Sequence, residues 1–220
     1  MRGAFCFLAL ALAIPSAGLA CVPIPVTEPE PGFVRRPLTN IGLLDEADLV
    51  VLAEVREAPV EGWEPGCLMG VTLAPQRALK GTAPDLLPVE GLIRERVCGE
   101  YFLPSPTALD EIHPSSRKGS CRRSTYSKQA LVIAMFEEKD GAFSELDHRF
   151  SRAIEDVEGP DALWVRAAEL YLRILSENAP VERREAFASE RDRLAAMTGD
   201  PDSQAIAADI TTYLEAAGQD

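Results

Sequence analysis

Short apolar stretches separated by polar turns run between residues 47 and 150, a pattern typical of β-strands. Five stretches predict strands, at residues 47–55, 68–79, 86–93, 130–136 and 142–150. Pro75 inside the second stretch indicates an edge or a bulge, because proline cannot donate to a strand ladder. Lys139-Asp140-Gly141 joins the last two stretches into a hairpin, since glycine accepts the positive φ of a tight turn. With no helical period between them, these strands predict a small antiparallel barrel.

Beyond Pro160 the apolar residues change to the period of helices. Three helices are expected, at about residues 160–178, 181–198 and 200–218. Asp200 is the expected N-cap of the third helix, and Pro201 occupies its first turn. The short connections predict an antiparallel three-helix bundle over residues 158–218.

Two segments show neither period. Residues 21–37 are rich in proline, which excludes a regular helix and favours an extended arm. Residues 98–127 form a long loop. This loop carries the basic cluster Arg117, Lys118, Arg122 and Arg123, which we expect to be solvated in an acidic protein.

Residues 1–20 have the form of an export signal. Arg2 precedes an uncharged apolar run, and small residues stand just before Cys21. The run is too short to cross a bilayer, which takes roughly 20 apolar residues. We therefore expect a secreted or periplasmic protein that begins at Cys21. A lipid anchor on Cys21 is the alternative, but Gly18 stands where a lipoprotein signal has Leu, which favours a disulfide role for Cys21.

The negative charge of the chain disfavours some classes of partner. The formal net charge is −13 at pH 7, and hydrophobic residues make up 46%, enough for a core. A negative surface repels phosphate backbones and anionic lipid headgroups, so nucleic acid is disfavoured as a partner. No apolar run after the signal is long enough for a transmembrane segment.

The mature chain keeps four cysteines, Cys21, Cys67, Cys98 and Cys121. An even number in an exported chain predicts two disulfides, for which three connectivities are possible. None of these cysteines lies in a CxxC pair, and only His113 and His148 could join them, which argues against a structural zinc site. We expect no cofactor.

Sequence signatures of catalysis are missing. The chain contains no HExxH, no GxSxG, no P-loop and no dinucleotide-binding glycine pattern. His148 follows Asp147 in an expected strand and is interpreted as a surface residue, and His113 lies in the long loop. The pattern favours a non-enzymatic protein.

Several short motifs occur in an order that resembles a known family. They are Cys21-Val22-Pro23 at the mature terminus, Ala47-Asp48-Leu49-Val50, Leu79-Lys80-Gly81, Val97-Cys98-Gly99-Glu100-Tyr101-Phe102 and the 130–136 strand with its Asp-Gly hairpin. In this order they resemble the N-terminal domain of the tissue inhibitors of metalloproteinases, a netrin-like OB-fold, and its bacterial relatives. The resemblance covers residues 21–150. It implies a five-stranded antiparallel OB-like barrel at 21–152. With the small C-terminal three-helix bundle that the helical period predicts, the expected fold class is α+β.

The resemblance also implies roles for individual residues. It pairs Cys21 with Cys98 and leaves Cys67 with Cys121. In that family the free amine and carbonyl of the N-terminal cysteine chelate the catalytic zinc of the target protease. Here Cys21 would be that metal-binding residue, with Val22 directed to the specificity pocket and Pro23 beside it.

Two functions of different classes follow. The first is a secreted or periplasmic protein-binding module without enzymatic activity, whose sharpest form is a metalloprotease inhibitor acting through Cys21. The second is an envelope-anchored structural or accessory protein, lipidated at Cys21, with the acidic helices as its contact surface.

Overall fold

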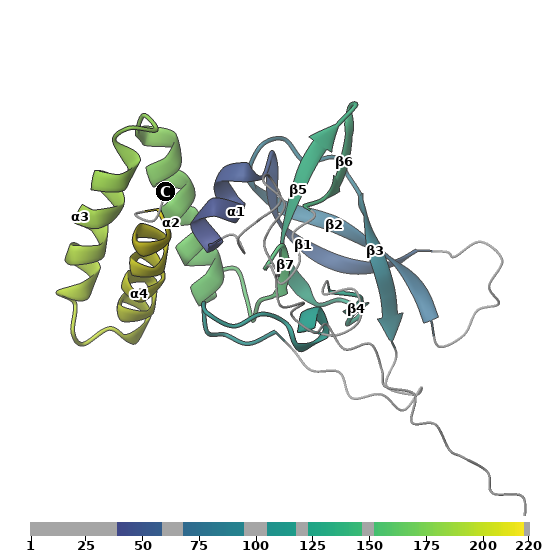
Figure 1. Cartoon of the computed structure of the whole chain (residues 1–220). Coiled ribbons are helices and arrows are strands. Elements are labelled where there is room, and N and C mark those ends of the chain that lie inside the picture. Colours follow the sequence, from purple (N-terminus) through teal and green to yellow (C-terminus); the bar gives the residue numbers. More distant parts are fainter. Residues whose placement is uncertain (1–38, 59–67, 95–104, 118–122, 147–151, 218–220) are drawn as a thin grey trace, which may run out of the picture.

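A computed structural model of the chain describes residues 39–58, 68–94, 105–117, 123–146 and 152–217 (Figure 1). Within these residues the fold is α+β, with seven strands in one curled, mixed sheet that forms a half-barrel, and four α-helices. The strands are β1 Leu49–Ala58, β2 Leu68–Lys80, β3 Leu87–Arg94, β4 Thr125–Tyr126, β5 Leu131–Lys139, β6 Ala142–Glu145 and β7 Ile154–Asp156. The helices are α1 Asn40–Glu46, α2 Leu163–Glu177, α3 Arg183–Ala195 and α4 Pro201–Ala216.

The sheet has the order β4-β3-β2-β1-β5-β6, with β7 paired to β5. The pairs β1–β2, β2–β3, β1–β5, β5–β6 and β5–β7 are antiparallel. β4 pairs with β3 in parallel, so the expectation of a purely antiparallel sheet of five strands is wrong. The two added strands, β4 and β7, have two and three residues, too few to produce an alternating pattern in the sequence.

The turn chemistry expected from the sequence is confirmed. Asp140 and Gly141 both have positive φ, 54° and 79°, as a tight hairpin turn between β5 and β6 requires. Opposite Pro75 the β1–β2 register shifts between Leu52 and Ala53, which marks a bulge. The returning strand β6 is described from Ala142 to Glu145, and residues 147–150 of the expected strand lie outside the described residues.

The central strand β1 is buried on both faces of the sheet. Leu49, Val51 and Val55 belong to the core inside the curled sheet, together with the buried Tyr126. Val50 faces the other way and joins the core that the sheet shares with the helices. Burial on both faces explains why this strand has a continuous apolar run rather than an alternating one.

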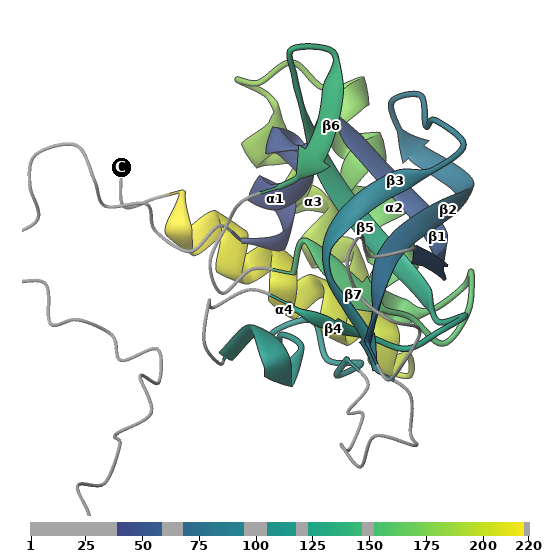
Figure 2. The same cartoon turned by 90° about the vertical axis from the view of Figure 1, so that its right-hand side faces the viewer.

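The helices cover the outer face of the sheet. α1 lies between the sheet and the longer helices, and Figure 2 shows α2 and α3 behind the strands. The three helices expected beyond Pro160 are present, and Asp200 caps α4 by accepting a hydrogen bond of 3.1 Å from the Asp202 N–H. α1 was not expected, because its seven residues are too few to show a helical period; the Thr39 hydroxyl caps it at 3.1 Å from the Gly42 N–H.

Among the described residues, no helix combines the length and the apolar character needed to cross a membrane. The expected signal peptide at 1–20 and the proline-rich arm at 21–37 lie outside the described residues.

Candidate functional site

The residues that the sequence singled out at the amino terminus lie outside the described part of the chain. These are Cys21, Val22 and Pro23. The same holds for His148 and for the cysteines expected to form disulfides, Cys67, Cys98 and Cys121. Their roles and pairing therefore stay predictions, and the structure directs attention to other residues.

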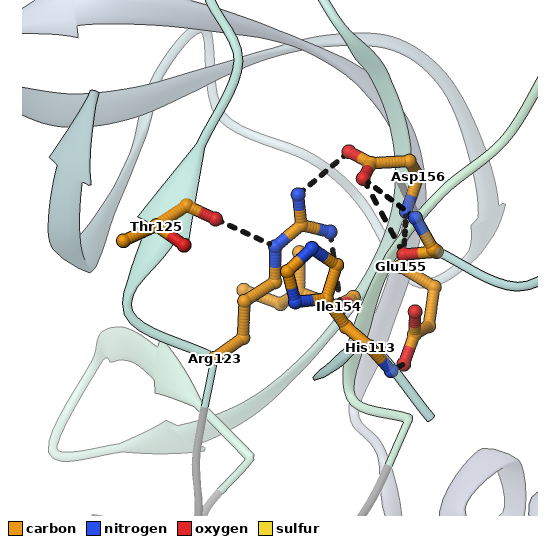
Figure 3. Close-up of polar contacts among 7 residues, drawn as sticks. His113, Arg123, Thr125, Ile154, Glu155 and Asp156 are labelled. Carbon is orange, nitrogen blue, oxygen red and sulfur yellow. Dashed lines mark hydrogen bonds and ion pairs between the residues drawn. The ribbon is translucent and has the colours of Figure 1, made fainter. Parts of the chain in front are cut away.

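A buried polar cluster joins the long loop to β7. We define it as Ser105, His113, Arg123, Glu155 and Asp156 (Figure 3). Arg123 is only 4% exposed, so its expected solvation is wrong. Its Nη2 lies 2.6 Å from Asp156 Oδ1, and its Nε donates to the carbonyl of Thr125 at 3.1 Å. A buried guanidinium needs such partners, because an unpaired charge in the interior is costly.

Asp156 also holds the start of this segment. Its Oδ2 accepts the backbone N–H of Ser105 at 3.2 Å, and its own N–H donates to Ser105 Oγ at 2.9 Å. Two reciprocal hydrogen bonds fix Ser105 against β7 across 51 residues of sequence. Asp156 thus ties both ends of the loop, at Ser105 and at Arg123.

Glu155 is the most deeply buried carboxylate of the cluster, with 0% exposure. One of its oxygens accepts the backbone N–H of His113 at 3.0 Å. Burial raises the pKa of Glu155, and the charge of Arg152 opposes this shift. Arg152 is itself buried, donates to the Ala108 carbonyl, and has its guanidinium carbon 5.2 Å from the ring centre of Trp164.

A second buried polar contact joins the helices to the loop. Asp209 of α4 accepts hydrogen bonds from the Tyr171 hydroxyl at 2.8 Å and from Asn40 Nδ2 at 2.9 Å. Asn40 Nδ2 also donates to the carbonyl of Leu109 at 2.8 Å. Burial raises the pKa of Asp209, and the hydrogen bonds from Tyr171 and Asn40 oppose the shift. This contact therefore connects α1, α2 and α4 to the loop.

These buried groups hold parts of the fold together. The ionisable side chains Arg123, Arg152 and Glu155 are at most 4% exposed, and a substrate cannot reach groups that are covered in this way. The described residues contain no set of three or more His, Cys, Asp or Glu side chains that could hold a metal ion. The cluster therefore positions the loop.

A groove of about 740 Å³ opens on the surface between the end of β2 and the helices. We call it the cationic groove. Its charged lining consists of Arg77, Lys80, Arg173 and Arg183 with the carboxylates Asp45 and Glu169. Positive charge therefore exceeds negative charge here, although the chain as a whole is strongly acidic.

Internal contacts hold most of these cations in place. Arg77 Nη1 lies 2.8 Å from Glu169 Oε1, which bridges β2 to α2, and Arg183 Nη1 lies 3.0 Å from Asp45 Oδ1, which bridges α3 to the end of α1. Lys80 Nζ donates to the carbonyls of Leu44 and Asp45, both at 3.0 Å. A cation at the carboxyl end of a helix satisfies terminal carbonyls and complements the helix dipole.

Lys80 and Arg173 differ in their surroundings. Burial lowers the pKa of Lys80, and the charges of Asp45 and Asp48 oppose the shift. Arg173 on α2 is exposed, and its guanidinium makes no hydrogen bond or ion pair with the residues that the structure describes. Arg173 is therefore the cation of the groove that is open to an incoming anion.

The apolar part of the groove comes from β2 and α2, through Leu79, Leu172 and Leu175. Leucines beside fixed cations give a surface with both apolar area and directional charge. Sequence reasoning missed this site because four separate elements supply its charges, and each charge alone is typical of a solvated surface. The sequence analysis used Leu79 and Lys80 only as part of the strand end Leu79-Lys80-Gly81 and assigned them no functional role.

The described residues thus offer two polar features, the cationic groove, which is open to the surface, and the buried polar cluster, which holds the loop against β7. Both depend on where the helices and the loop pack against the sheet. A comparison of the chain with models of known protein families, with curated proteins and with solved structures finds no significant match.

Proposed function

We propose that this chain is a non-enzymatic protein-binding module that acts outside the cytoplasm, as a secreted or periplasmic protein. One observation carries the proposal: the buried ionisable side chains are covered by the fold, whereas the cationic groove opens to the surface with charged and apolar side chains. Such a surface suits recognition, because it offers apolar area and oriented charge without a reactive group aimed at a substrate.

Export is supported by the sequence of residues 1–20. The proposed architecture is an OB-like barrel formed by the curled sheet, with α2, α3 and α4 as the helical bundle beside it. The β1-β2-β3 meander and the pairing of β5 with β1 support this assignment. OB-type barrels bind partners through an open face and the loops beside it.

The sharpest form of the proposal is an inhibitor of a zinc metalloprotease. The amine and carbonyl of Cys21 would chelate the protease's zinc, and Val22 and Pro23 would lie along its substrate cleft. A disulfide between Cys21 and Cys98 would fix the direction of the terminus. The support is the order of sequence motifs between residues 21 and 150.

The experiment that tests the module uses the mature chain starting at Cys21, exported and processed by the organism that makes it. The chain is purified with its bound proteins, each captured protein is identified by mass spectrometry, and the complex is rebuilt from purified components. We expect a complex of fixed stoichiometry whose partner keeps its mass after prolonged incubation. Failure to rebuild a complex with any exported protein, or chemical conversion of the partner, contradicts the proposal.

A further inference from the structure

We propose that the cationic groove binds an acidic, extended segment of the partner protein, with carboxylates at the rim and an apolar side chain on the leucines. This inference rests on the proposed function, because it assigns the site and the chemistry of the partner. It needs neither the amino-terminal cysteine nor any residue outside the described part of the chain.

The charge of the groove favours an anionic ligand. The groove collects four cations and two carboxylates in a protein whose net charge is −13. The two carboxylates are already engaged, Glu169 with Arg77 at 2.8 Å and Asp45 with Arg183 at 3.0 Å. The excess positive charge therefore lies on Arg173 and Lys80, which make no ion pair within 4.0 Å among the described residues, although the charges of Asp45 and Asp48 act on Lys80 and that of Glu190 acts on Arg173.

Three of the four cations of the groove are held in place before a ligand binds. Arg77 and Arg183 are held by ion pairs from different helices, and Lys80 is held by two carbonyls at the end of α1. Side chains that are already fixed lose little conformational entropy when a ligand binds. Lys80 is also partly buried, and this burial lowers its pKa. An additional carboxylate would therefore be attracted more strongly to the Lys80 ammonium than to that of a fully hydrated lysine.

The charge of the whole chain and the leucines of the groove favour a peptide over other anions. A nucleic acid or an anionic bilayer would bring many negative charges against a chain whose net charge is −13, and long-range repulsion would oppose binding. A short peptide segment, in contrast, carries only a few carboxylates, and all of them can lie within the groove. Its intervening apolar side chains would cover the partly buried Leu79 and Leu172, which a bare phosphate would leave in contact with water.

The direct test is fluorescence anisotropy with the full mature chain. The probe is a fluorescein-labelled heptapeptide, acetyl-Gly-Glu-Leu-Glu-Leu-Glu-Gly-amide, compared with versions that carry Gln or Lys in place of each Glu. We expect the Glu peptide to bind at least about tenfold more tightly than the Gln peptide, a difference of about 1.4 kcal/mol. Binding should weaken as salt rises from about 0.05 to about 0.5 M, because the Debye length shortens. Equal binding of all three peptides overturns the proposal.

Charge reversal locates the site. Arg173→Glu should weaken binding of the Glu peptide about tenfold or more, because an attraction becomes a repulsion. Lys139→Glu makes the same change in net charge at the exposed β5–β6 turn and should leave binding unchanged. Equal loss of binding in both variants would mean that the total charge of the chain, and not the groove, governs binding, and would overturn the proposal. Tighter binding of a phosphate oligomer or an anionic vesicle than of the Glu peptide would also overturn it.

Capture of the partner separates this inference from the proposed function. The wild-type chain and Arg173→Glu are compared under the conditions that yield the rebuilt complex. We expect the partner on the wild-type chain and at most about a tenth of it on Arg173→Glu. If both chains hold the partner equally, the groove assignment is wrong while the binding module stands. If neither holds a partner, the proposed function itself is contradicted.

Discussion

Arg123 and Asp156 form a buried ion pair in which Nη2 lies 2.6 Å from Oδ1, with only 2% and 12% of the two side chains exposed. The pair joins the end of the long loop to β7, and Asp156 also holds Ser105 at the other end of the loop. Asp156 is thus one of several contacts that hold residues 105–117 and 123–126 on the fold, beside the Glu155–His113 hydrogen bond and the β3–β4 pairing.

We predict that Asp156→Ala lowers the free energy of unfolding by about 3 to 5 kcal/mol, because it leaves the guanidinium of Arg123 buried without its carboxylate. Urea unfolding measured by circular dichroism tests this. The double variant Arg123→Met with Asp156→Leu should recover a large part of the loss, since it removes both charges. A loss below about 1 kcal/mol for Asp156→Ala would mean that the pair is solvated.

The burial of Glu155 should make the free energy of unfolding depend on pH. Burial raises its pKa, so the folded protein holds the proton more tightly than the unfolded chain does. The stability that protonation contributes is present below the pKa of an exposed Glu, about 4.3, and is lost as the pH rises through the raised folded pKa. The charges of Arg152 and Arg123 reduce this loss but do not reverse its sign.

Glu155→Gln removes that titration. The free energy of unfolding of the variant, relative to wild type, should therefore increase as the pH rises from about 4 to about 7. The measurement is a series of urea unfolding curves for both proteins across this range. Parallel pH profiles for the two proteins would show that Glu155 titrates as an exposed carboxyl.

The expected pairing of the cysteines can be tested on the wild-type protein. Peptide mapping without reduction should find Cys21 linked to Cys98 and Cys67 linked to Cys121. Closing loops of this length contributes about 3 to 5 kcal/mol each in the chain-entropy model, so reduction should lower the unfolding midpoint markedly. Peptides that link Cys21 to Cys67 contradict the pairing.

The mature amino terminus distinguishes a secreted or periplasmic protein from the alternative, a lipid-anchored envelope protein. Mass spectrometry of the exported chain should show a protein that begins at Cys21 with a free amine. A diacylglyceryl group on Cys21 would instead identify a lipid-anchored envelope protein. If inhibition of a metalloprotease is observed, one alanine added before Cys21 should abolish it, because the added peptide bond replaces the free amine; unchanged inhibition rules out chelation by that amine.

The elements with long apolar patterns could be predicted from the sequence. β2 and the three C-terminal helices were expected nearly at their observed bounds, because each spans enough residues to show its period. α1, β4 and β7 could not be predicted, since two, three or seven residues show no period and their positions depend on distant partners. The parallel β3–β4 pair likewise joins residues more than 30 positions apart.

The candidate site could be predicted only in part. Arg123 was expected to be solvated because its neighbours in the sequence are polar, while its partner Asp156 lies 33 residues later. The carboxylates Glu155 and Asp156 between apolar Ile154 and Val157 were the available signal, since charges within a short apolar stretch indicate buried partners. The cationic groove left no such signal, because its residues come together only when the helices pack on the sheet.

The measurement that tests the central claim most directly is photo-crosslinking in the exporting cells. A photoreactive phenylalanine analogue replaces Ser176, which is exposed at the groove, or Lys139, which is exposed at the distant β5–β6 turn. A protein-binding module that uses the cationic groove predicts one discrete adduct with an exported protein from position 176 and none from position 139. No adduct from either position, or the same adducts from both, would contradict it.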